Sequence, residues 1–132
     1  MTGTDVQQAV EVDAPRERLW ELLSDPAELP RWWPDAASLE PRVGGRVVLE
    51  FGPGDVSGEV TSWEPPTRLG FTWEASNMPG VQLHVTFTVD DLGGGRSRVG
   101  VVHSGFADAP AEAREAVAGG WSHFLPRLAE AA

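Results

Sequence analysis

Three histidines are the side chains of this sequence that titrate closest to neutral pH, and one of them lies in a pattern that suggests chemistry. His103 alternates with Val99 and Val101 in "RVGVVHS", so we expect its ring to point inward from a strand. A buried imidazole needs a partner. It could orient a ligand or act as a general acid or base, and the alternative is a ring satisfied by a backbone carbonyl or a buried water.

The other titratable residues offer less. His84 falls on the polar face of its predicted strand and His123 lies off the apolar stripe of a predicted helix, so both are expected to be exposed. Glu50 and Glu59 lie in predicted strands, and the sequence leaves open whether either carboxylate reaches His103 to form an acid/base pair. The histidines lack metal-ligand spacing, the chain has no cysteine, and "GGG" at 93–95 is a turn between strands. We therefore expect no metal and no cofactor.

The segment "PRWWPD" places Trp32 and Trp33 side by side between Pro30 and Pro34. Adjacent residues do not share a face of a helix, so the two rings are expected to point in different directions. One interpretation is that both are core residues, since aromatic rings mostly serve burial. The other is that one ring anchors the segment while its neighbour faces a ligand.

Length and charge limit the classes of partner. At 132 residues the chain has the size of a single domain, 1–132, and its ten basic residues, all arginine, against twenty acidic ones give a net charge of -10. This acidic balance argues against binding to nucleic acid or to an anionic membrane. The chain has no apolar run long enough for a signal peptide or membrane span, so a cytoplasmic location is expected. Arginine without lysine, with abundant Ala, Gly and Pro, is typical of a GC-rich bacterial sequence.

Hydrophobic periodicity predicts the elements that would position these residues. A strand is expected within 5–14, a helix within 15–25, a short helix within 24–33, strands within 46–52, 57–63, 68–74, 81–91 and 97–106, and a long helix within 109–132. Gly119, Gly120 and Pro126 should bend that last helix or make it irregular. The pattern predicts an α+β fold, in which one face of an antiparallel sheet is covered by the last helix and short helices close a cavity at one end.

The order and spacing of several segments resemble the START-like helix-grip (SRPBCC) superfamily. Within it, the chain is similar to bacterial proteins related to the C-terminal domain of the Hsp90 ATPase activator. The segments that carry the resemblance are "APRERLWELLSDPAELPRWW", "GGRVVLEF", "GEVTSWEPPTRLGFTWE", "VTFTV", "HSGF" and "GGWSHFLPRL". The resemblance implies a curved antiparallel sheet of six to seven strands that grips the long C-terminal helix around a hydrophobic cavity. The superfamily uses such cavities for lipids, polyketides and other apolar ligands.

By analogy, one tryptophan of the pair anchors the short helix, and Trp33 overhangs the cavity mouth as part of a lid. The other residues expected at the cavity are inward residues of the strands and the helix stripe: Phe51, Phe71, Trp73, Val85, Phe87, His103, Trp121, Phe124 and Leu125. The alternative is that these residues are simply core, because cavity lining and core have the same sequence signature.

We therefore predict a protein that binds a small, largely apolar ligand, lipid- or polyketide-like, in an internal cavity. An alternative is a polyketide cyclase or dehydratase that uses His103 as acid/base, so catalysis is left open. A third is a co-chaperone-like interaction module, although the sequence offers no support for a chaperone partner. A monomer and a homodimer are both compatible with the sequence.

Overall fold

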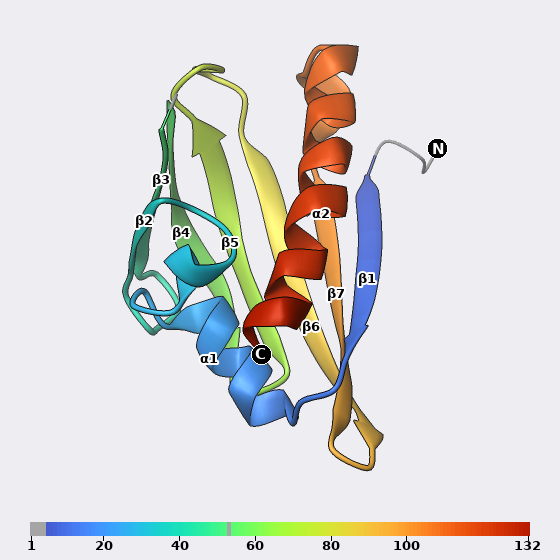
Figure 1. Cartoon of the computed structure of the whole chain (residues 1–132). Helices are drawn as coiled ribbons and strands as arrows, with labels where there is room; N and C mark the ends of the chain where they lie inside the picture. Colours follow the sequence, from blue (N-terminus) through green and yellow to red (C-terminus); the bar gives the residue numbers. More distant parts are fainter. Residues whose placement is uncertain (1–4, 53) are drawn as a thin grey trace.

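The computed structural model of the chain describes residues 5–52 and 54–132. They form a seven-stranded antiparallel sheet, in the order β1-β7-β6-β5-β4-β3-β2, with a long helix across one face (Figure 1). The strands are β1 (Val6–Val12), β2 (Ala36–Leu39), β3 (Arg46–Phe51), β4 (Gly54–Glu64), β5 (Arg68–Ala75), β6 (Leu83–Gly93) and β7 (Arg96–Ser104). The helices are α1 (Arg16–Ser24) and α2 (Ala111–Ala131), with 3-10 turns η1 (Leu29–Arg31) and η2 (Phe106–Asp108). The predicted α+β fold, with a curved sheet and a long C-terminal helix, is confirmed.

Alternation along the strands determines which face of the sheet is buried. Strand β6 buries every second residue, namely Leu83, Val85, Phe87 and Val89. His84 lies between them and points to the outer face, where its Nε2 is 2.7 Å from the Thr61 hydroxyl. On β7 the same alternation buries His103 with Val99 and Val101, as predicted.

Helix α2 lies on the inner face of the sheet and buries Trp121, Leu125 and Leu128. It runs without a break from Ala111 to Ala131, so the residues at which the sequence predicts a bend or irregularity do not interrupt it. Gly119 and Pro126 are both exposed, so the weak helix formers stand mostly on the solvent side. Packing of the apolar stripe stabilises helices in proteins more than intrinsic propensity does.

The segment before β2 contains one helix and one turn, where the sequence predicts two short helices. Helix α1 buries Leu19, Leu22 and Leu23, but the second predicted helix is reduced to η1. Asp25 ends α1, and its carboxylate accepts a hydrogen bond from the Ala27 N–H at 2.9 Å. Prolines at 30 and 34 limit the length of η1. The short strand β2, "AASL", was not predicted, because it shows no clear apolar alternation.

Strand β4 is irregular where it passes β5. Their register shifts between Val60 and Ser62, which is typical of a β-bulge and increases the local twist. Near this point, a Cβ on Gly58 would lie 1.8 Å from the carbonyl oxygen of Thr72, so only glycine permits the observed approach of the two strands. A bulge of this kind bends the strand and so contributes to the curvature of the sheet. Pro53, which precedes β4 in the predicted "GPGD" turn, lies outside the described residues.

Among the described residues, no helix combines the length and the hydropathy that a membrane crossing requires.

Candidate ligand-binding site

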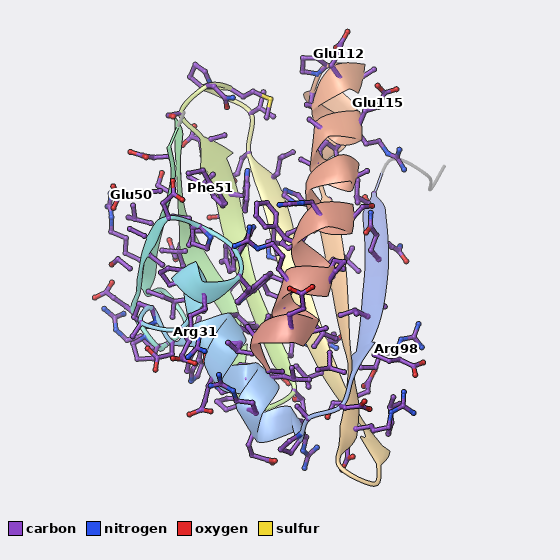
Figure 2. All side chains as sticks on the ribbon, viewed as in Figure 1. Arg31, Glu50, Phe51, Arg98, Glu112 and Glu115 are labelled. Carbon is purple, nitrogen blue, oxygen red and sulfur yellow. The ribbon has the colours of Figure 1, made fainter. Side chains whose placement is uncertain are left out.

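A cavity of about 330 Å³ lies between the amino-terminal half of α2 and the sheet. Figure 2 shows Phe51 on the sheet side and Glu112 and Glu115 at the amino-terminal end of α2. Its lining includes two exposed residues, Asp55 at the start of β4 and Asn77 just after β5. Its lining is mainly apolar: Trp33, Phe51, Gly54, Asp55, Val56, Trp73, Ala75, Asn77, Met78, His103, Ala113, Ala116, Val117, Gly120, Trp121 and Phe124.

Aromatic rings form the inner wall, and Trp33 is their common neighbour. Its ring centroid lies within 6.4 Å of six other aromatic rings. Trp121 of α2 is 5.0 Å away, and Trp73 of β5 is stacked on it at 5.8 Å. These contacts hold the short segment after η1 against both the sheet and the helix. The wall is therefore formed by side chains from four separate parts of the chain.

The two adjacent tryptophans have different environments. Trp32 is fully buried, and its indole Nε1–H donates a 2.7 Å hydrogen bond to the carbonyl of Leu22 in α1. Trp33 stacks on it with the ring centroids 5.3 Å apart, and it lines the cavity. Trp33 is 6% exposed, so it belongs to the inner wall and not to a lid over the mouth. The expected lid position is therefore not observed, because rings on both sides enclose Trp33.

The structure brings six of the ten expected site residues to the cavity: Trp33, Phe51, Trp73, His103, Trp121 and Phe124. The other four, Phe71, Val85, Phe87 and Leu125, lie outside the lining and are at most 3% exposed. Phe87 is typical, because its ring packs edge-on against Trp33 and Trp121 from behind, at 5.6 and 5.5 Å. Alternation identifies the inner face of the sheet, but it does not tell which inward side chains are covered by packing against other core residues and which are left to line the cavity.

Sequence reasoning missed the small residues of α2 that create the space. Ala113, Ala116 and Gly120 line the cavity, with Val117 between them. Apart from the adjacent residues and the backbone of α2 itself, no described heavy atom lies within 4 Å of the place where a Cβ on Gly120 would be. Their helical spacing was a signal, because small residues at positions 113, 116 and 120 fall on one face. Asn77 and Met78, from the β5–β6 loop, gave no such signal.

His103 is the one fully buried imidazole of the described residues, at 0% exposed. Its Nδ1 lies 3.2 Å from the indole Nε1 of Trp121, while its Nε2 has no hydrogen-bond partner among the described residues. The rings of Trp73 and Phe106 pack around it at 4.8 and 5.3 Å. Burial, with a smaller effect from the charge of His84, lowers the pKa of His103 to about 3. The ring is therefore neutral at physiological pH.

No carboxylate forms a pair with His103 in the described part of the chain. Glu50 and Glu59, the two candidates, are exposed on β3 and β4, which are separated from β7 in the sheet by β5 and β6. The same described residues hold no group of side chains suited to a metal ion. Within the described residues, the arrangement offers a mainly apolar space with the buried ring of His103 in its lining.

The sequence profile of the family described as "Activator of Hsp90 ATPase homolog 1-like protein" matches residues 13–132. No curated protein matches the chain significantly.

Solved structures resemble the chain over nearly all of its length. DynU16, a protein of the dynemicin biosynthetic locus, is 27% identical with a TM-score of 0.85, over 98% of this chain and 47% of its own. This chain therefore spans about half of that neighbour. Protein MLL2253 from Mesorhizobium loti is 26% identical with a TM-score of 0.83, over 95% of each chain. The Aha1 dimer from Colwellia psychrerythraea, at 20% identity and a TM-score of 0.84 over 99% of this chain and 96% of its own, shares the fold.

Proposed function

The chain belongs to the Activator of Hsp90 ATPase homolog 1-like family, and from its cavity we propose that it binds a small, largely apolar molecule between α2 and the sheet. The observation that carries the proposal is the 330 Å³ space, whose inner wall is aromatic. Protein interiors are packed densely and contain few voids larger than a water molecule. A space of this size is within the range of small-molecule sites, which are also mostly apolar with a few polar groups.

The shape of the wall indicates the kind of molecule. Trp73 is stacked on Trp33, Trp121 is tilted against it, and Phe51 and Phe124 flank them. Flat rings gain most by stacking or by edge-to-face contact with other rings. A planar, polyketide-like ligand therefore fits this wall better than a flexible acyl chain. The place of the neighbour DynU16 in a biosynthetic locus supports a small molecule as ligand.

The two alternatives have less support. A cyclase or dehydratase would use His103 as acid/base, but its low pKa and the lack of a carboxylate partner make it a poor proton carrier at neutral pH. A co-chaperone-like module would need an apolar docking surface. The exposed large hydrophobic residues of the described part of the chain are Val43, in the turn before β3, and Leu92, near the end of β6.

Two adjacent glycines of α2 provide the test. A Leu side chain at Gly120 would enter the cavity, whereas one at Gly119 would point to solvent. Beyond the adjacent residues and the backbone of α2, neither Cβ has a described atom within 4 Å. Each change replaces a poor helix former by a good one and should raise stability by up to about 1 kcal/mol. We expect the neutral dye N-phenyl-1-naphthylamine to bind the parent and Gly119→Leu at one saturable site, and to bind Gly120→Leu at least tenfold more weakly.

Equal dye affinity of the two variants would refute the cavity as the binding site. Native mass spectrometry of the purified parent gives an independent readout, because a copurified small molecule should be present in the parent and in Gly119→Leu, and depleted in Gly120→Leu.

A further inference from the structure

The contact between Trp121 and His103 determines where the imidazole carries its proton. An indole N–H can only donate a hydrogen bond, so His103 Nδ1, 3.2 Å away, must be the acceptor. A neutral imidazole has one N–H, which must then be on Nε2. Trp121 thus selects one of the two neutral tautomers of His103.

The selected tautomer leaves a buried donor with nothing to donate to. His103 is 0% exposed and lines the cavity, and Nε2 has no partner among the described residues. The rings of Trp73 and Phe106 pack around His103, with centroids 4.8 and 5.3 Å from its own. A buried donor without a partner costs about 1–3 kcal/mol. This cost would be recovered by a ligand that brings an acceptor to Nε2.

Resting on the proposed binding function, we propose that the site selects uncharged aromatic ligands that carry a hydrogen-bond acceptor, such as a ketone or quinone oxygen. His103 Nε2–H donates to that oxygen. Trp121 is the positioning residue, because it holds the tautomer that makes His103 a donor.

The same geometry discriminates against anionic ligands. To pair with a carboxylate ligand, His103 would have to become an imidazolium with protons on both ring nitrogens. The proton on Nδ1 would then face the Trp121 N–H, and two hydrogen-bond donors cannot bond each other. Among the described residues that line the cavity there is no arginine, whereas Asp55 is one of them. Glu112 and Glu115 add negative charge at the same end of α2 (Figure 2). A carboxylate would enter this apolar space without a compensating cation, which is costly.

Fluorene and 9-fluorenone provide matched probes, since they share a tricyclic skeleton and differ by the carbonyl. Their dissociation constants are measured by quenching of tryptophan fluorescence with the parent and with His103→Phe, which keeps an aromatic ring and loses the donor. The preference for fluorenone over fluorene should be about fivefold greater in the parent than in the variant, the usual worth of one hydrogen bond. Taking the ratio of the two preferences cancels the different solubilities of the probes.

The outcomes separate the two proposals. If both probes bind and the two proteins show the same preference, the acceptor rule is wrong and the binding function stands. If neither probe binds the parent, both proposals fail for planar aromatic ligands. Fluorene-9-carboxylate is the anionic probe, and at pH 7 it should bind the parent at least tenfold more weakly than fluorene does. If it bound more tightly than fluorenone, the proposed discrimination against anions would be wrong.

The role of Trp121 has a spectroscopic test that does not depend on a ligand. Nitrogen-15 NMR of the imidazole distinguishes a protonated from an unprotonated ring nitrogen. In the parent, His103 should show a protonated Nε2 and an unprotonated Nδ1. In Trp121→Phe the two forms should mix, which a purely space-filling role of Trp121 would not cause. A protonated Nδ1 in the parent would refute the inference directly.

Discussion

Acid should destabilise the folded protein through His103, and the size of the effect follows from its burial. In the native state the pKa of this ring is lowered to about 3, whereas an unperturbed histidine has a pKa of about 6.5. Between these values the unfolded chain binds a proton that the folded chain does not. Stability therefore falls as the pH is lowered through 6.5, and it continues to fall until the native ring is protonated near pH 3.

The magnitude at a mild pH can be worked out from the linkage relation. Each pH unit below the unfolded pKa costs about 1.4 kcal/mol, so the His103 contribution between pH 7 and pH 5 is about 2 kcal/mol. That figure is the same for any native pKa below about 4, because the native ring is then still neutral at pH 5. It is a large share of the 5–15 kcal/mol typical of a domain.

The assay compares urea unfolding of the parent and of His103→Phe at pH 7 and pH 5. Other groups that titrate in this range, including His84, contribute to both proteins, so the difference between their pH dependences isolates His103. The variant also leaves the Trp121 N–H without its acceptor, which lowers its stability equally at both pH values. The parent should lose about 2 kcal/mol more than the variant on going to pH 5. Equal losses in the two proteins would refute the claim that His103 is neutral because it is buried.

Two further predictions concern stability. Trp32→Phe removes the hydrogen-bond donor to the buried carbonyl of Leu22, so it should lower the unfolding free energy, measured in urea, by about 1–3 kcal/mol. Dye affinity should stay within twofold, because Trp32 does not line the cavity. A large loss of affinity at unchanged stability would contradict the different roles assigned to Trp32 and Trp33. Gly58→Ala places a Cβ against the Thr72 carbonyl oxygen and should lower the unfolding free energy by about 1–3 kcal/mol. The control Gly94→Ala, in an open turn, should show only the cost of its positive φ. Equal effects of the two changes would show that β4 can move away from β5.

The sequence predicted the fold well because its main signals are local. Strand β6 alternates so regularly that its buried face is evident, and the stripe that contains Trp121, Leu125 and Leu128 defines the inner side of α2. Strand β2 was missed because four residues, "AASL", carry too little pattern. Its pairing with β3 is a tertiary contact, and no local signal records it.

The site was less predictable, for a physical reason. Phe71 and Phe87 point to the same face of the sheet as Trp73, yet only Trp73 lines the cavity. Which inward side chains lie beside the cavity and which are covered depends on where α2 crosses the curved sheet, and this is not a local property of the sequence. The inward direction of His103 could be predicted, but its partner Trp121 is 18 positions away on another element. The glycines of α2 were interpreted as weak points of the helix, although Gly120 provides part of the space.

The arrangement of the tryptophans also has an optical consequence. The chain has six tryptophans and no tyrosine, so its near-ultraviolet absorption and emission come almost wholly from indole rings. Trp20 and Trp63 form one pair with centroids 5.2 Å apart, whereas Trp33 lies within 5.8 Å of Trp32, Trp73 and Trp121. Rings this close exchange excitation energy, so light absorbed by any member of the second group can be emitted, or lost, at the one that touches a ligand. Excitation energy is therefore shared among Trp33 and its three tryptophan neighbours beside the cavity. The intrinsic tryptophan emission of the unlabelled protein should report whether the cavity is occupied.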